Sequence, residues 1–267
     1  MTPNKPNRVG APLRPAVSIY VEMGDLIARE IARMAKSCEK DLREAFERSD
    51  HHSAMDDTIT AQARIALNAL RERWTIRFNR LAKRVTQRMI DRTLKNSAVT
   101  LGTSLREVSE GFKIDTSLSD ARLQEVIKAS TMEAAGLIKR IPEKFLGDVQ
   151  SQVMRSITNG RGMQDLAPYL TKQYHGQSKW ARHVAMDQTR KAYSNINQVR
   201  LQAVGCETYI WVHTGGGQHP RKDHIAMNGK EYRWDAPPII DPKTSERGKP
   251  GDAIFCRCIA RPVFKLS

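Results

Sequence analysis

Two cysteines that stand one residue apart, Cys256 and Cys258, are the side chains of this sequence best suited to chemistry. A histidine upstream of them, His224, offers an imidazole nitrogen. Tetrahedral zinc prefers four sulfur or imidazole donors, and small loop-rich regions gain stability from such an ion. We therefore take these three residues as candidate metal ligands, with zinc as the candidate cofactor. Further donors elsewhere in the sequence are His213, His219 and Cys206.

The one-residue spacing of the cysteines allows a second interpretation, in which they bind nothing. Side chains at positions i and i+2 of a strand share a face, whereas structural zinc sites usually present Cys-x2–4-Cys from a turn. On one strand, Cys256 and Cys258 would both face a small core while Arg257 points outward. With Cys38 included, the sequence holds 4 cysteines, too few for a disulfide scaffold at 267 residues.

In that interpretation His224 forms a hydrogen bond to the turn at Asn228-Gly229. Gly229 then takes a positive φ angle in a type I′ hairpin turn between Ile225 and Tyr232, a conformation that glycine adopts without steric cost. The surrounding core is formed by Trp211, Trp234 and Phe255.

The residues around His224 also raise the alternative that the protein is an enzyme. Asp223, His224 and Asn228 resemble the pattern of metal-dependent HNH nucleases, in which a histidine activates water. No histidine follows His224 in the sequence, and the cysteines are not a Cys-x2-Cys pair. We therefore predict no catalytic residues and no enzyme activity, and keep a metal-dependent nuclease as the alternative.

Composition divides the chain into three parts that must position these residues. Residues 1–15 are rich in proline, which favours a flexible, extended arm. Residues 16–204 show apolar residues at three- and four-residue steps, the pattern of amphipathic helices. Residues 205–267 are rich in β-branched, aromatic, glycine and proline residues, which predicts short strands and loops. The predicted fold class is mainly α: a multi-helix N-terminal region followed by a small strand-and-loop (α+β) domain.

The helices and breaks are expected at definite ranges. Expected helices cover Val17–Ser49, Ala61–Lys95, Leu123–Lys139, Pro142–Ser156, Met163–Tyr174 and Ser178–Val204. Pro142 suits a first helical turn, where its missing N–H costs nothing. Between the helices we expect a polar connector at Ser49–Asp57, which includes His51 and His52, a linker at Gly102–Ser119 and a tight turn at Asn159–Gly162.

The Ala61–Lys95 segment carries a stripe of arginines beside its apolar stripe. It holds ten basic residues against two acidic ones, a local charge of +8. Guanidinium groups at helical spacing can follow a phosphate backbone or an acidic partner, whereas the simpler interpretation is a solvated face. We take as candidate DNA-binding residues Arg73, Arg77, Arg80, Arg84 and Arg88.

Charge and hydropathy indicate which partners and locations the protein can have. The chain carries 44 Lys+Arg against 29 Asp+Glu, a formal net charge of +15, which indicates a polyanionic neighbour such as nucleic acid. Apolar stretches are broken by polar and charged residues before the roughly 18 residues that a membrane span needs. Residues 1–15 lack the apolar segment of a secretory signal. We expect a protein of the cytoplasm with no membrane partner.

A longer pattern surrounds the cysteine pair. Helices are followed by Trp211, Arg221-Lys-Asp-His224, Met227-Asn-Gly229, Trp234, Pro237, Pro238, Phe255-Cys-Arg-Cys258 and Pro262. Upstream come the turn Asn159–Gly162 and a helix with Ala185, Thr189, Arg190 and Asn195. Over roughly residues 150 to 265 the sequence resembles the Mu F-like head-morphogenesis family of phage minor head proteins. The motif residues of this resemblance are Trp211, His224, Gly229, Cys256, Arg257 and Cys258.

The resemblance implies a low-copy component of a tailed-phage head. Such a protein is associated with the portal vertex and contributes to head morphogenesis and to DNA packaging or ejection. The implied partners are the portal protein, the major capsid protein and double-stranded DNA. The implied location is the virion head, reached from the host cytoplasm during assembly. A toxin-like effector that carries a Mu F-like region is an alternative to this role.

Overall fold

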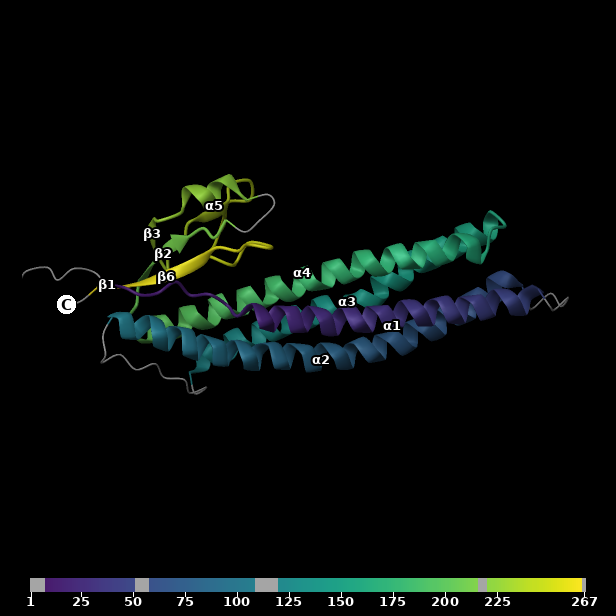
Figure 1. The fold of residues 1–267 in the computed structure, drawn as a ribbon, viewed down its shortest axis with the longest axis horizontal. Coiled ribbons are helices and arrows are strands. Elements are labelled where there is room, and N and C mark those ends of the chain that lie inside the picture. Colours follow the sequence, from purple (N-terminus) through teal and green to yellow (C-terminus); the bar gives the residue numbers. More distant parts are fainter. Residues whose placement is uncertain (1–7, 51–57, 109–119, 216–219, 266–267) are drawn as a thin grey trace, which may run out of the picture. The chain divides into compact units, whose positions relative to one another are not determined.

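The computed structural model describes residues 8–50, 58–108, 120–215 and 220–265. Within these ranges, long helices fill the middle of the chain and short strands occupy its two ends (Figure 1). The helices are α1 (Val17–Asp50), α2 (Ile59–Val108), α3 (Ala121–Thr158), α4 (Met163–Ala203) and the short α5 (Lys222–Ala226). The strands are β1 (Arg8–Val9), β2 (Thr208–Val212), β3 (Glu231–Arg233), β4 (Ile239–Asp241), β5 (Glu246–Arg247) and β6 (Ile259–Phe264). The predicted mainly α class is confirmed.

The chain forms two compact units, and their boundaries differ from the division expected at residue 204. The sheet unit comprises residues 1–20, 88–131 and 186–267. The helix unit comprises residues 21–87 and 132–185. Each of the four long helices contributes residues to both units. The candidate metal ligands and the last turns of α4 therefore belong to one unit.

The helix unit is built on the apolar stripes that the sequence predicts. On α2, the stripe residues Leu70, Trp74 and Phe78 are almost completely buried, and the rings of Trp74 and Phe78 meet edge to face at 6.4 Å. The residues between them are exposed, so burial repeats every three or four positions. No helix in the described ranges has the length and hydropathy needed to cross a bilayer.

Three of the expected helix boundaries are wrong, because the long helices run through them. Helix α2 continues past Gly102 to Val108, and residues 109–119 of the expected linker lie outside the described ranges. Helix α3 is continuous across Pro142, and α4 is continuous across Tyr174–Ser178. Proline removes one helical hydrogen bond. Burial of Ile141 and Phe145 on either side holds α3 together at that point.

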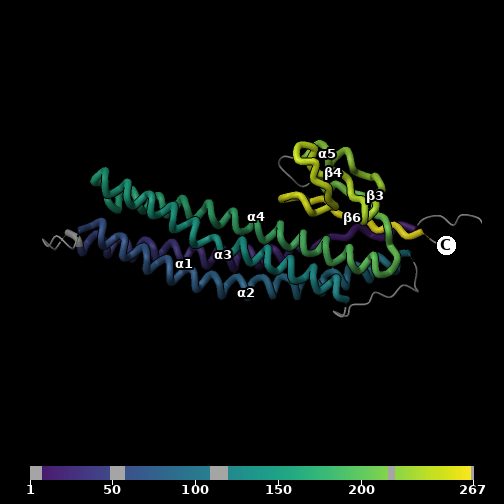
Figure 2. The backbone as a smooth tube through the Cα atoms, turned by 180° about the vertical axis from the view of Figure 1, so that it is seen from behind, coloured from purple at the N-terminus to yellow at the C-terminus, as the bar shows by residue number. Residues whose placement is uncertain are grey.

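The sheet unit contains a four-stranded antiparallel sheet in the order β1-β6-β2-β3 and a separate two-stranded sheet of β4 and β5. The long central pairing matches Thr208 with Val263 and Val212 with Ile259. Its apolar side chains join residues of α2 and α4 in one core, which includes Tyr209. Figure 2 shows from behind how the chain passes through α5, β3 and β4 before β6.

From Arg8 onward, the proline-rich N-terminal segment is bound to the sheet unit. Arg8 and Val9 pair with Phe264 and Val263 of β6. The backbone N–H groups of Gly10 and Leu13 continue this pairing by donating to Pro262 and Ala260 at 2.9 Å. Leu13 is buried in the core of the sheet unit. Residues 1–7 of the expected flexible arm lie outside the described ranges.

Replacing Gly10 by alanine should destabilise the sheet unit. A Cβ at this position would collide with Ser104 Oγ and lie 3.0 Å from Pro262 Cγ. We expect a loss of about 1–3 kcal/mol in the free energy of unfolding, the usual cost of overpacking, measured by urea denaturation. Gly102→Ala is the control, because a Cβ there meets nothing within 4 Å. It should instead add about 0.5–1 kcal/mol. Equal effects of the two changes would contradict the close approach at Gly10.

Candidate metal centre

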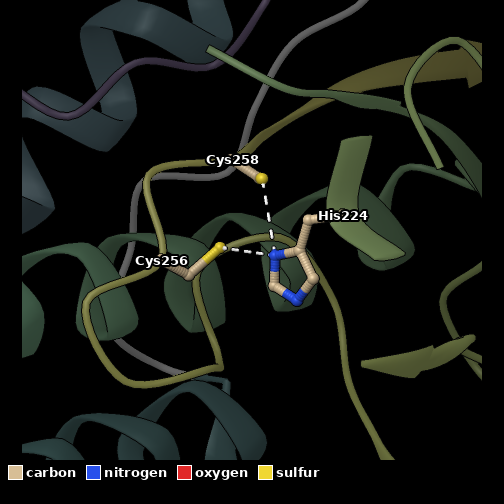
Figure 3. Close-up of side chains that lie close together, drawn as sticks. All are labelled: His224, Cys256 and Cys258. Carbon is tan, nitrogen blue, oxygen red and sulfur yellow. Dashed lines mark hydrogen bonds between the residues drawn. The ribbon is translucent and has the colours of Figure 1, made fainter. Parts of the chain in front are cut away.

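The three predicted ligands come together in the sheet unit (Figure 3). Their ligand atoms all lie within 4.8 Å of one another. His224 Nδ1 lies 3.5 Å from Cys256 Sγ and 3.7 Å from Cys258 Sγ. All three side chains are at most 5% exposed. The structure therefore brings the three candidate ligands into one buried cluster.

Helix α5 and its surroundings fix the orientation of the His224 ring. His224 is the buried residue of α5, and its Nε2 lies 3.2 Å from the carbonyl oxygen of Ile240 in β4. A carbonyl oxygen only accepts, so Nε2 carries the proton and Nδ1 faces the sulfurs with its lone pair. Trp211 packs edge to face against the ring at 5.2 Å. The imidazole is thus held in one orientation and in one tautomer.

Cys256 closes a turn before β6 and Cys258 directly precedes that strand, so the two cysteines are not on a strand as expected. The Cys256 backbone N–H closes the turn by donating to the Ala253 carbonyl at 2.9 Å. Phe255, just before it, has a φ angle of +58°, a left-handed conformation that is unusual for a residue with a side chain. This kink turns both thiols inward. Phe255 itself is 42% exposed, so its expected place in the core is wrong.

One face of α4 holds this turn in place. Asp187 Oδ1 accepts the Phe255 backbone N–H at 2.7 Å, and Arg190 donates to the Arg257 carbonyl at 3.3 Å. Further along the same face, Ser194 donates to the Pro250 carbonyl at 2.7 Å. The positions 187, 190 and 194 follow the three- and four-residue steps of a helix face. Sequence reasoning missed this role, although the polar stripe at helical spacing is visible in the sequence.

Two residues outside α4 also hold the turn. Thr214 donates its hydroxyl hydrogen to the Arg257 carbonyl at 2.9 Å. Arg221, immediately before α5, donates to the Ile254 carbonyl at 3.0 Å. The predicted motif residue Arg257 is exposed, as expected, and its backbone oxygen receives two of these bonds.

The thiols and the imidazole perturb one another. The hydrogen bond with the Cys258 thiol outweighs burial and, together with the contact with His224, lowers the pKa of Cys256 to about 4. The same contact raises the pKa of Cys258. Contact with Cys256 raises the pKa of His224. These contacts favour the thiolate form of Cys256, and the thiolate is the form that acts as a ligand.

A fourth donor stands at the edge of this cluster. His213 directly follows β2, and its Nδ1 lies 3.5 Å from Cys258 Sγ. Its backbone N–H donates to the Asn228 side-chain oxygen at 2.8 Å. Gly229 has a φ angle of +81°, so the predicted positive φ is confirmed. The predicted hairpin is wrong, because Ile225 belongs to α5 and the turn leads from that helix into β3.

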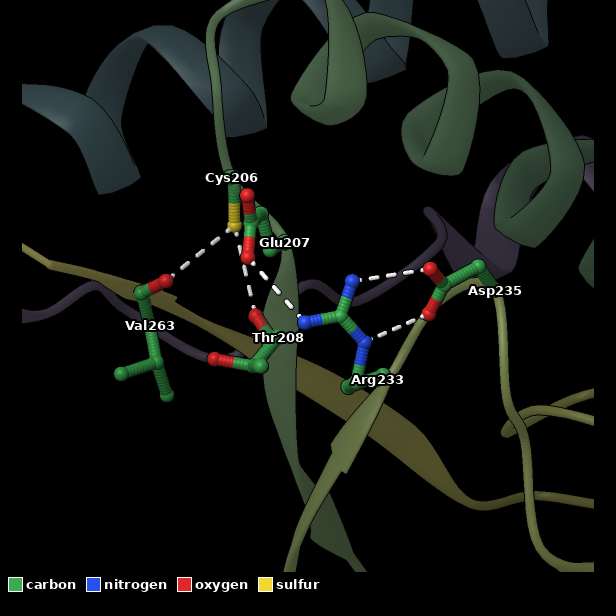
Figure 4. A network of polar contacts seen from close by, with 6 residues as sticks. All are labelled: Cys206, Glu207, Thr208, Arg233, Asp235 and Val263. Carbon is green, nitrogen blue, oxygen red and sulfur yellow. Dashed lines mark hydrogen bonds and ion pairs between the residues drawn. The ribbon is translucent and has the colours of Figure 1, made fainter.

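Apart from His213, the other donors considered from sequence lie outside the cluster wherever the structure describes them. Cys206 Sγ lies 3.3 Å from the Thr208 carbonyl and 3.5 Å from the Val263 carbonyl, as Figure 4 shows beside the ion pairs of Arg233. Cys38 is buried on α1 in the helix unit. His51, His52 and His219 lie outside the described ranges.

The arginine stripe of α2 is exposed, but part of it is neutralised from α1. Arg73 pairs with Asp41 at 3.0 Å, and Arg77 pairs with the buried Glu30 at 2.7 Å. Within the described ranges, Arg80 and Arg84 have no ion-pair partner. These two line a surface hollow of the helix unit together with Arg33, Arg77, Glu30 and Leu81. The fifth candidate, Arg88, falls in the sheet unit.

The burial of His224 argues against the alternative of a nuclease. Its side chain is 2% exposed and both ring nitrogens face protein atoms, so a phosphodiester cannot reach it. Asp223 and Asn228 are exposed. The Asn228 side chain accepts the His213 backbone N–H. This arrangement serves the position of a loop and not the activation of water.

Comparison with known proteins points to the same region. A family model described as Phage Mu protein F like protein matches residues 147–261, a range that includes α4, α5 and the cysteine turn. An uncharacterized protein of Haemophilus influenzae is 27% identical over 165 residues, which cover 59% of this chain and 35% of that protein. The chain therefore spans about a third of the length of that relative. No solved structure matches the present chain.

Removal of the Asp187 carboxylate should loosen the cysteine turn. Asp187→Ala deletes the acceptor of the Phe255 N–H and also the ion pair with Lys191 at 3.2 Å. We expect a loss of about 1.5–3 kcal/mol in the free energy of unfolding, since the hydrogen bond has a charged partner. Cys256 and Cys258 should also react faster with a thiol reagent. Asp187→Asn retains an acceptor oxygen and should lose less; an alanine variant with unchanged stability and thiol reactivity would exclude this role.

Proposed function

Because residues 147–261 belong to the Phage Mu protein F like family, we propose that this protein is a minor head protein of a tailed bacteriophage. The chain is a phage head-related protein. In the proposed role it is a low-copy component at the portal vertex, where it binds the portal protein and the major capsid protein. It contributes there to head morphogenesis and to the packaging or ejection of double-stranded DNA.

The observation that carries this proposal is the extent of the family match. The matched range holds both partners of the contact between α4 and the cysteine turn, from Asp187 to Arg257. It also holds His224 and both cysteines. The range matched by the family model therefore includes the residues that build the sheet unit around this site. This supports a common scaffold for the region, and with it the head-associated role.

Contact with DNA is proposed for the helix unit. In the hollow of Arg33, Arg77, Arg80 and Arg84, four guanidinium groups stand against one carboxylate, that of Glu30. Guanidinium groups match phosphate oxygens in geometry and charge. The formal net charge of +15 adds a long-range attraction for a polyanion. Arg80 and Arg84 are the residues that we expect to meet the phosphate backbone.

The head role predicts that the protein is a component of the virion. Mass spectrometry of gradient-purified virions should find the chain at far lower copy number than the major capsid protein. Co-expression with an affinity-tagged portal protein should retain it on the resin, whereas co-expression with a tagged tail protein should not. Absence from purified virions would reject the proposal and favour the toxin-like alternative.

Loss of the free arginines should weaken DNA binding and its dependence on salt. The double variant Arg80→Gln, Arg84→Gln removes up to two phosphate contacts, each contributing about 0.9 to the slope of log K against log salt. The slope for duplex DNA, measured by fluorescence anisotropy, should fall by up to about 2. Arg43→Gln, Arg48→Gln is the control, because these exposed arginines pair with glutamates of their own helix. Equal slopes for both double variants would argue against a DNA contact at this hollow.

A further inference from the structure

We propose that His213, His224, Cys256 and Cys258 form a closed zinc site, in which His213 is the ligand that completes the tetrahedron. The proposal assigns a ligand set of two sulfurs and two imidazole nitrogens. It does not depend on the head role, because it rests on the contacts within the sheet unit alone.

Three sulfur–nitrogen distances match those of a tetrahedral zinc site. Zn–S bonds of about 2.3 Å and Zn–N bonds of about 2.0–2.1 Å, at tetrahedral angles, separate sulfur from nitrogen by about 3.6 Å. The observed separations are 3.5 Å for Cys256 with His224, 3.7 Å for Cys258 with His224 and 3.5 Å for Cys258 with His213. Three independent edges of the tetrahedron are therefore already at their expected length.

The lone pair of His224 favours an ion over direct hydrogen bonds. Nε2 is committed to the Ile240 carbonyl, so Nδ1 has one lone pair and no proton. Two sulfurs lie at nearly equal distance from this nitrogen (Figure 3). The lone pair of Nδ1 can accept the hydrogen of one thiol at most and repels the lone pairs of the other sulfur, whereas a cation between the three atoms binds all of them. A ring N–H bonded to a backbone carbonyl is also the usual support of a metal-binding histidine.

His213 is placed for the fourth position by the strand before it. Trp211 and His213 are two positions apart, the spacing that puts both side chains on one face of an extended segment. Trp211 contacts the His224 ring, so the same face directs His213 toward the cluster. Its backbone is fixed by the hydrogen bond to Asn228, and its ring reaches Cys258. Half-buried His213 would close the side of the site that faces solvent.

A site with four protein ligands is structural, because no position is left for water or substrate. The ion would join three segments directly through their side chains: the end of β2, helix α5 and the cysteine turn. Both cysteines bind as thiolates, and any proton that a thiol carries passes to solvent when the ion binds. The charges of two thiolates then balance the charge of Zn²⁺.

The test uses the purified full chain, freed of metal by a chelator under reducing conditions and titrated with Co²⁺ alone and then with Zn²⁺. We expect one Co²⁺ per chain, with the intense visible bands of tetrahedral cobalt and a thiolate charge-transfer band, all lost when Zn²⁺ replaces it. X-ray absorption of the zinc form should show two sulfur and two nitrogen ligands. Zinc should also raise the melting temperature of the chain.

Variants separate the ligands from their neighbours. Cys256→Ser, Cys258→Ser and His224→Ala should abolish the cobalt bands. His213→Ala should weaken zinc binding by at least about tenfold and exchange one nitrogen ligand for oxygen. The controls are Cys206→Ser, a buried cysteine outside the cluster, and His175→Ala, an exposed histidine of α4; both should bind as the parent chain does. His224→Cys offers a replacement ligand and should restore the bands if His224→Ala fails to fold.

Three results would overturn the proposal. The first is the absence of a thiolate charge-transfer band when saturating Co²⁺ is added to the chelator-treated chain, although circular dichroism shows that this chain is folded. The second is a Cys256–Cys258 disulfide, found by mass spectrometry, that persists under reducing conditions. The third is a zinc form whose coordination and affinity are the same in His213→Ala as in the parent chain, which removes His213 from the ligand set.

Discussion

The hydrogen bond from the Phe255 backbone N–H to the Asp187 carboxylate, 2.7 Å long, is the contact on which the cysteine turn depends. The left-handed backbone of Phe255 costs on the order of 1–2 kcal/mol for a residue with a side chain. Its ring, 42% exposed, recovers little of this by burial. The buried carboxylate offsets the strain instead. Without that turn, Cys256 and Cys258 would continue as strand, and only the turn brings both sulfurs to His224.

Helix α4 can act as an anchor because it is itself fixed to α2. Asn197 accepts a hydrogen bond from Ser97 at 2.6 Å, and Arg200 donates to the same serine at 2.8 Å and to the Leu94 carbonyl at 3.1 Å. These groups are buried, so any sliding of one helix along the other would leave polar atoms unpaired. The register between α2 and α4 therefore also determines, through Asp187, the position of Cys256 and Cys258.

The elements with a regular pattern were predictable, and the contacts between distant residues were not. The stripe of Leu70, Trp74 and Phe78 revealed α2, because one-sided burial produces a 3.6-residue period. The break expected at Pro142 was wrong, since a local rule cannot weigh the burial on either side of it. The three candidate metal ligands were chosen by residue type alone. The turn that unites them depends on a contact across 68 positions, which leaves no signature in the local sequence.

The pairing of β1 with β6 has a consequence for the time course of folding. The hydrogen bond from Arg261 to the Gly10 carbonyl joins residues 251 positions apart. During synthesis, the helices can form as they emerge, but β1 has no partner until β6 has left the ribosome. Closing so long a loop carries a large entropic cost, which is best met after the helices have brought the ends together. The four-stranded sheet can therefore be completed only after the helices between β1 and β6 have been made, so the fold of the sheet unit closes late.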